Sequence, residues 1–131
     1  MCNAAGNKIL SIHSRNAVSD VLEIMGKSFQ GKAILHYYTG TLKNLSLAIN
    51  RGFYFSINLS MTQSKIGKKL ILEIPIERIL TESDYPFLDI GISQKEYLQK
   101  TSAEIGKIKG VSQNDVATQI FENIKRILEY S

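Results

Sequence analysis

Short apolar runs alternate with longer segments in which apolar residues recur three or four positions apart. Ile9–His13 is a compact β-rich run, whereas Asn16–Lys27 has the apolar spacing of a helix with one buried face. Strands that alternate with helices imply a parallel sheet covered by helices, which is the α/β class. The expected strands are Ile9–His13, Lys32–Tyr38, Phe53–Leu59 and Glu77–Thr81, and the expected helices are Asn16–Lys27, Thr41–Arg51, Met61–Leu72, Ser93–Lys109 and Ser112–Tyr130.

The last part of the chain has a different organisation. Ser93–Lys109 and Ser112–Tyr130 are two successive amphipathic helices, and Gly110 between them suits a helix end. No Pro/Gly-rich linker or low-complexity stretch divides the sequence. We therefore expect residues 1–131 to form one domain.

Three of the expected strands end in residues that can bind a metal. The first ends at His13, the second reaches His36, and the fourth runs into Glu82 and Asp84. In α/β barrels the active site lies at the carboxyl ends of the strands. Imidazole suits zinc and other transition metals, while carboxylates also suit magnesium and manganese. Each of these residues alone can be an ordinary polar residue at a strand end, but together they favour a metal-dependent enzyme.

Several neighbours of these residues are suited to bind a phosphorylated substrate. The Arg15 guanidinium can pair with a phosphate, and the rings of Tyr37 and Tyr38 can stack on nucleobases. Simpler explanations are a solvated arginine and aromatic packing of a loop. The cluster Lys65, Lys68 and Lys69 can guide a polyanion or form a solvated helix face.

Composition narrows the class of protein. Hydrophobic residues make up 44% and charged residues 21%, which is usual for a folded domain, and the net charge is +4. A single cysteine, Cys2, excludes a disulfide framework. There is no apolar stretch long enough for a membrane helix and no signal-peptide pattern near Met1. We therefore expect a cytoplasmic protein with no membrane contact.

The order of several motifs resembles the TatD family of metal-dependent deoxyribonucleases, within the amidohydrolase-like barrels. The matching segments are His13-Ser14-Arg15, His36-Tyr37-Tyr38-Thr39-Gly40, Gly52-Phe53-Tyr54-Phe55-Ser56, the stretch from Pro75 to Pro86, Ile105 to Gly110, and Asn123. Ser83 stands where the family more often has threonine. The match extends over nearly the whole chain.

The resemblance implies a fold and a set of roles. The fold is the C-terminal half of a TIM-type (β/α)8 barrel, with about four parallel strands and two closing helices. His13, His36 and Asp84 are the implied metal ligands, and Glu82 and Asp84 the implied catalytic carboxylates. The implied reaction is hydrolysis of phosphodiester bonds in DNA, often from the 3′ end of single strands. Divalent magnesium, manganese or zinc is the implied cofactor.

The family's first-strand His-x-His pair and its mid-barrel glutamate have no counterpart in this chain. We therefore expect a partial barrel that exposes sheet edges and associates with a missing N-terminal half or with a second copy. Two alternatives remain open from the sequence. The chain can be a non-catalytic half-barrel that binds a partner or nucleic acid, or another metal-dependent hydrolase of the same barrel class.

Overall fold

The computed structural model describes residues 6–84 and 91–129. Four parallel strands form one sheet in the order β1-β2-β3-β4. Helices follow the strands in alternation, as the hydrophobic pattern predicts. The elements are β1 (Ile9–His13), α1 (Val18–Met25), β2 (Lys32–His36), α2 (Leu42–Asn50), β3 (Tyr54–Ile57), α3 (Leu59–Gln63), α4 (Lys65–Glu73), η1 (Ile76–Arg78), β4 (Ile79–Thr81), α5 (Gln94–Lys109) and α6 (Gln113–Glu129).

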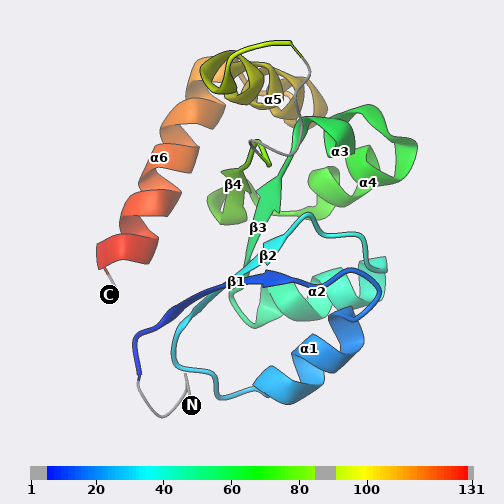
Figure 1. Ribbon diagram of the computed structural model, residues 1–131, viewed down its shortest axis with the longest axis vertical. Coiled ribbons are helices and arrows are strands. Elements are labelled where there is room, and N and C mark those ends of the chain that lie inside the picture. Colours follow the sequence, from blue (N-terminus) through cyan, green and yellow to red (C-terminus); the bar gives the residue numbers. More distant parts are fainter. Residues whose placement is uncertain (1–5, 85–90, 130–131) are drawn as a thin grey trace.

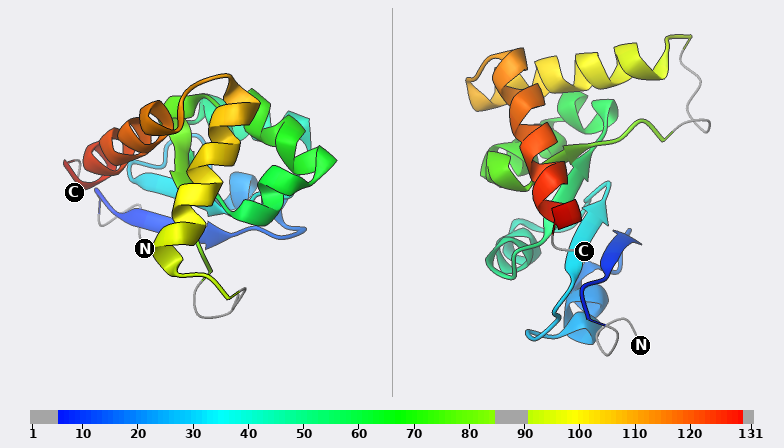
Figure 2. Two further views of the ribbon diagram at one scale, coloured as in Figure 1. Left: turned by 90° about the horizontal axis from the view of Figure 1, so that it is seen from above. Right: turned by 90° about the vertical axis from the view of Figure 1, so that its left-hand side faces the viewer.

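The helices are distributed unevenly around the sheet (Figure 1; Figure 2). Helices α1 and α2 lie together beside the first strands, whereas α5 and α6 lie near β4 at the other end of the molecule. The main core fills the space between sheet and helices, with Leu35, Phe55 and Ile79 fully buried. A smaller cluster, in which Tyr54 and Leu80 pack with α6, lies apart from this core.

The two end strands of the sheet differ in their surroundings. At β4, the buried Asn123 of α6 donates from Nδ2 to the carbonyls of Ile76 and Ile79, at 2.9 and 2.8 Å. At β1 every second residue is exposed, and Ile9 keeps 37% of its surface in contact with solvent. The exposed sheet edge that the sequence predicts is therefore β1, while α6 covers backbone groups at β4.

Several expected boundaries are wrong. The second strand ends at His36 rather than at Tyr38, and the fourth begins at Ile79 because Ile76–Arg78 form the short helix η1. The third strand ends at Ile57 and α3 begins at Leu59, and the single helix expected over Met61–Leu72 is two helices. The break falls at Ser64, where the backbone is extended. The Ser64 hydroxyl caps the start of α4 by accepting a hydrogen bond from the Gly67 amide at 2.9 Å. A Cβ atom at Gly67 would lie 2.0 Å from the Met61 carbonyl oxygen, so the two short helices approach too closely for any other residue.

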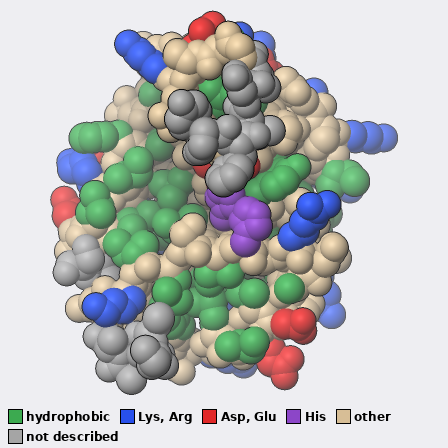
Figure 3. Space-filling model, viewed as in Figure 1, with side chains coloured by type: hydrophobic (Ala, Val, Ile, Leu, Met, Phe, Trp, Pro, Cys, Tyr) green, Lys and Arg blue, Asp and Glu red, His purple; other side chains and the backbone are tan. Residues whose placement is uncertain are grey.

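The tail folds as predicted into two helices. Gly110 ends α5 in the left-handed conformation, with φ 71° and ψ 32°. Helix α6 keeps a second apolar strip exposed to solvent, formed by Phe121, Ile124 and Leu128. Figure 3 shows hydrophobic side chains on the face that carries the two histidines. Among the described residues, no helix is both long and apolar enough to cross a membrane.

Candidate metal centre

The carboxyl ends of the strands lie level with one another, which brings distant residues together. His13 pairs directly with His36 in the parallel register of β1 and β2, and His36 pairs with Ser56 of β3. The Glu82 amide donates to the Ile57 carbonyl at 3.0 Å, so β4 continues beside β3 for one residue beyond its assigned end. The register therefore places His13, His36 and Glu82 at one edge of the sheet, as the sequence predicts.

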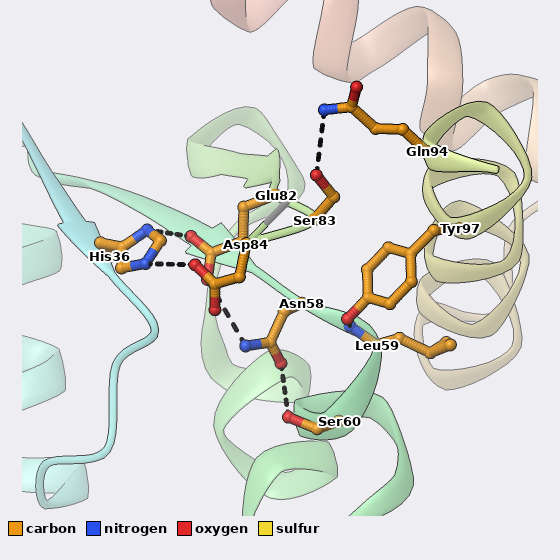
Figure 4. Close-up of polar contacts among 9 residues, drawn as sticks. All are labelled: His36, Asn58, Leu59, Ser60, Glu82, Ser83, Asp84, Gln94 and Tyr97. Carbon is orange, nitrogen blue, oxygen red and sulfur yellow. Dashed lines mark hydrogen bonds and ion pairs between the residues drawn. The ribbon is translucent and has the colours of Figure 1, made fainter. Parts of the chain in front are cut away.

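His36 lies between two carboxylates (Figure 4). Its Nδ1 atom contacts Oε2 of Glu82, and its Nε2 atom lies 2.9 Å from Oδ1 of Asp84. One donor atom from each of the three residues lies within 4.8 Å of the other two. We call these three residues, His36, Glu82 and Asp84, the metal triad.

Glu82 is the more buried of the two carboxylates of the triad, with 9% of its side chain exposed. Burial, together with the negative charge of Asp84, raises the pKa of Glu82 to about 7, although hydrogen bonds from Ser56 and Asn58 oppose that rise. Burial disfavours a charged carboxylate because the protein interior solvates the charge less well than water. A bound cation would offset this cost by stabilising both carboxylates.

Asn58 holds the Glu82 carboxyl from the opposite side. Its Oδ1 atom starts α3 by accepting from the Met61 amide at 3.0 Å and from the Ser60 hydroxyl at 2.7 Å. Its Nδ2 atom donates to Oε1 of Glu82 over a long hydrogen bond of 3.5 Å. Only 1% of Asn58 is exposed, so its amide has one orientation that serves all three contacts.

Helix α5 contacts the loop that carries Glu82 and Asp84 and the loop that carries Asn58. The Tyr97 hydroxyl accepts from the Leu59 amide at 3.0 Å, and Gln94 donates to the Ser83 hydroxyl at 3.0 Å. Burial raises the pKa of Tyr97, with smaller contributions that include the charges of Asp84 and Glu82. One helix thus holds both the loop after β3 and the loop after β4 (Figure 4).

Asn58, Tyr97 and Gln94 were not among the residues expected from the sequence. Asn58 does carry a sequence signal, because an asparagine between a strand and an apolar helix segment is a preferred helix start. Tyr97 occupies a buried position of an amphipathic helix, which is a position typical of core residues. Its contact with Leu59 spans 38 residues of sequence, so spacing alone did not indicate it.

The other expected site residues lie at different distances from the triad. The His13 ring stacks on the His36 ring, with centroids 4.5 Å apart and an interplanar angle of 30°. Arg15 is exposed two residues later in the chain. Tyr37 is partly buried directly after His36, whereas Tyr38 is fully buried, with its hydroxyl donating to the Thr41 carbonyl at 2.6 Å. The Tyr38 ring therefore has no face open to a base.

Three residues that follow strand ends adopt the left-handed backbone conformation. Asn16, Tyr37 and Asp84 have φ values of 57°, 48° and 52°. Asparagine and aspartate adopt this conformation more readily than other residues with a side chain, so Tyr37 is the strained position, and strained backbone often occurs at functional sites. Tyr37 directly follows His36 of the triad, and Asp84 belongs to the triad. Tyr85 and Pro86, the next residues of the motif, lie outside the described part of the chain.

The chemistry of the triad fits a divalent metal. An imidazole and two carboxylates suit zinc, manganese or magnesium. Histidine binds a metal through one ring nitrogen and usually donates from the other to a carboxylate, which fixes the ring. Because each nitrogen of His36 faces its own carboxylate, the triad offers both functions. Its ligand atoms come from the end of β2 and from the segment after β4, which lie on either side of β3 in the sheet.

Comparison with known proteins places this chain in a family. Residues 3–129 match the family TatD related DNase. An uncharacterized metal-dependent hydrolase from Buchnera aphidicola is 33% identical over 129 residues, which cover 92% of this chain and 49% of that protein. Human Deoxyribonuclease TATDN3 is 26% identical, over 94% of this chain and 48% of its own. The chain thus spans about half the length of the curated relatives it matches.

Solved structures confirm the fold. The crystal structure of a TatD family hydrolase from Entamoeba histolytica superposes with a TM-score of 0.75 and 18% identity, over 91% of this chain and 50% of that one. The TatD homologue YJJV from Escherichia coli gives a TM-score of 0.77 at 15% identity, over 91% and 49%. Both the α/β fold and the family expected from the motifs are confirmed, and the chain aligns with about half of such a barrel. This chain belongs to the TatD-related DNase family.

Proposed function

We propose that this chain forms the metal centre of a nuclease that hydrolyses phosphodiester bonds of DNA, acting on single strands from the 3′ end. The observation that carries the proposal is the metal triad, an imidazole and two carboxylates gathered at the carboxyl end of the sheet in a chain of this family. The proposed cofactor is a divalent metal, either magnesium, manganese or zinc. Human Deoxyribonuclease TATDN3 supports DNA as the substrate class by its name.

The residues of the triad would divide the work between them. A bound metal supplies positive charge that polarises the phosphate. Asp84 is the more exposed carboxylate, with 27% of its side chain accessible, so it is the group that can reach both metal and substrate. Glu82 is held by Asn58 and faces the other nitrogen of His36, so it orients the imidazole.

Proton transfer also has a candidate in the triad. A general base works best when its pKa lies near the working pH. The pKa of Glu82 is about 7 in the metal-free chain, and a bound cation would lower it. We assign acceptance of the proton from the attacking water to Asp84, because it is more exposed than Glu82. His13 would support the site through its stack on His36 or as a further ligand.

The test is cleavage of single-stranded DNA by the purified 131-residue chain. Matched substrates labelled at the 3′ or the 5′ end are incubated with Mg²⁺, Mn²⁺ or Zn²⁺, and with EDTA. The expected result is metal-dependent loss of the 3′ label as mononucleotide, which both His36→Ala and Asp84→Asn abolish. Asp115→Asn is the matched control, because Asp115 is an exposed carboxylate in the first turn of α6.

Three results would count against the proposal. Cleavage that survives both site variants would identify a contaminating nuclease. Metal binding that depends on the triad, without cleavage of any DNA, would instead support a chain that binds nucleic acid or a partner without turnover. Cleavage of another ester or amide under the same conditions would assign the chain to a different metal-dependent hydrolase activity.

A further inference from the structure

Two hollows beside the metal triad share the residues Thr39 and Ile66, and so form one continuous groove. We propose that this groove holds the stretch of single-stranded DNA that leads into the metal site. The inference rests on the proposed function, since it assigns a path to the same substrate. We call this surface the strand groove.

The first hollow of the groove begins next to the triad. It has a volume of about 430 Å³ and lies between the loop after β2 and the helices α3 and α4. Tyr37, which directly follows His36, forms one wall, and Met61 and Leu70 form apolar surface. Ser60 also lines this hollow, and its hydroxyl donates to Asn58, the residue that donates to Glu82. A substrate in this hollow therefore lies close to the metal triad.

The second hollow extends the groove away from the triad. It has a volume of about 410 Å³ and lies where α1 and α2 begin. Its polar lining includes Asn16, Thr41 and Asn44, whose amides and hydroxyl can bond to phosphate and sugar oxygens. Asn44 donates to Ser19 at 3.0 Å, so a side-chain contact ties α1 to α2 within the hollow.

The charges around the groove match a polyanion. None of the residues that line either hollow is acidic. Arg15, Lys43, Lys65 and Lys68 are exposed and stand next in sequence to lining residues, whereas Asp20 is an acidic neighbour. Lysine and arginine contacts to phosphates supply most of the affinity for a nucleic acid backbone.

The aromatic wall adds a contact for bases. Aromatic side chains bind single strands by stacking on successive bases, with little dependence on sequence. Tyr37 adopts a φ of 48°, an uncommon conformation for tyrosine, and its amide donates to the Ser56 carbonyl at 3.2 Å. The backbone is thus held in a strained form at the position where the groove meets the triad. Aromatic wall, polar lining and cationic border together favour a nucleic acid strand over an apolar ligand.

The test places a negative charge in the middle of the groove. Ile66 lies where the two hollows meet and is 72% exposed, so Ile66→Glu leaves the core intact. Leu72→Glu is the matched control, because Leu72 lies on the same helix, is 57% exposed and lines neither hollow. Affinity for a fluorescein-labelled single-stranded DNA is measured by anisotropy in EDTA, which prevents metal-dependent cleavage. We expect Ile66→Glu to weaken binding by about tenfold or more and Leu72→Glu by less than about twofold.

Salt dependence provides a second measurement. Replacing both Lys65 and Lys68 by alanine should reduce the slope of log affinity against log salt by roughly 1.4, because each phosphate contact to a single strand contributes about 0.7. Equal affinities of the two glutamate variants, an unchanged salt slope, or no binding of DNA by the wild-type chain would each overturn the strand groove. A wild-type chain that cleaves DNA while Ile66→Glu binds normally would overturn the groove alone. Groove-dependent binding without cleavage would overturn the proposed nuclease alone.

Discussion

The imidazole rings of His13 and His36 stack with their centroids 4.5 Å apart, because the two residues are directly opposite each other in the register of β1 and β2. Only His36 belongs to the metal triad. His13 therefore packs against the triad from β1, which is an end strand of the sheet. His13 can act by packing against His36 or by binding metal itself, and two substitutions at His13 separate these roles.

We predict that His13→Ala weakens metal binding by about 10- to 100-fold, the range typical of residues that orient a ligand. His36→Ala should abolish binding in the same titration. His13→Phe keeps a ring against His36 and loses the nitrogen donors, so it should restore most of the affinity if the stack is what matters. Isothermal titration of the metal-free chain with Mn²⁺ or Zn²⁺ measures all three. No recovery with phenylalanine would show that His13 is itself a ligand.

Asn58 should be more sensitive to substitution than an ordinary helix-capping residue. Asn58→Ala removes the start of α3 and the donor to Glu82, and we expect it to lower the free energy of unfolding by about 2–3 kcal/mol. Ser93→Ala is the control, because Ser93 starts α5 by accepting from the Glu96 amide and should cost about 1 kcal/mol. Urea denaturation gives both values. Equal costs would show that the contact with Glu82 contributes nothing to stability.

A third variant separates the two functions of Asn58. Asn58→Asp retains an oxygen that can accept from the Met61 amide but places a carboxylate where the donor to Glu82 was. The free energy of unfolding of the metal-free chain should fall, since two carboxylates then face each other without a donor between them. If Asn58→Asp is as stable as the wild-type chain near neutral pH, Asn58 acts on α3 alone.

The sequence predicts the order of elements in this fold better than their ends. The expected strand Phe53–Leu59 keeps an apolar residue at every second position, yet the strand ends at Ile57 because Asn58 starts a helix. The helix break falls at Ser64, whose hydroxyl accepts from the Gly67 amide, and periodicity does not reveal the close approach of Gly67 to the Met61 carbonyl that accompanies this break. Local hydrogen bonds of single polar side chains decide both boundaries.

The sequence could indicate the position of the metal triad because parallel strands bring their carboxyl ends to one side of the sheet. The sequence could not indicate the residues that hold the triad in place, because Tyr97 contacts Leu59 from a position 38 residues later in the chain. The same limit applies to Tyr38, whose place after His36 indicates a site residue as readily as a core residue. Its full burial follows from packing against Phe55, with ring centroids 5.8 Å apart.

Glu82 should make the stability of the metal-free chain depend on pH. Its pKa is about 7 in the folded chain and near its usual value of 4.5 in the unfolded chain. Between these values the folded state binds more protons, so the free energy of unfolding falls as pH rises from about 4.5 to about 7. Glu82→Gln should remove this fall and unfold at higher urea than the wild type at pH 8 in EDTA. The reverse order at pH 8 would show that the contact with His36 outweighs the cost of burial.

Bound metal should reverse the higher stability of Glu82→Gln relative to the wild type at pH 8. A cation stabilises the Glu82 carboxylate, so saturating Mn²⁺ at pH 8 should raise the urea midpoint of the wild type more than that of Glu82→Gln. Asp115→Asn serves as the control for a change of one charge, because Asp115 is exposed on α6. We expect its response to Mn²⁺ and to pH to match that of the wild type. Equal metal responses of Glu82→Gln and the wild type would exclude Glu82 from the metal centre.

Tyr38 should prove to be a core residue whose hydroxyl matters at high pH. Burial raises its pKa to about 12, and its hydroxyl donates to the Thr41 carbonyl at 2.6 Å. The unfolded chain loses this proton near pH 10, so the folded state binds more protons above that pH and stability falls as pH rises toward 12. Tyr38→Phe should cost about 1 kcal/mol at pH 7 and reduce the alkaline loss. Urea denaturation at pH 7 and pH 11 measures both effects. Tyr38 also lines the first hollow of the strand groove, but its side chain is fully buried, so the same variant should leave the affinity for single-stranded DNA unchanged. A marked loss of affinity would show that the Tyr38 hydroxyl contributes to substrate binding.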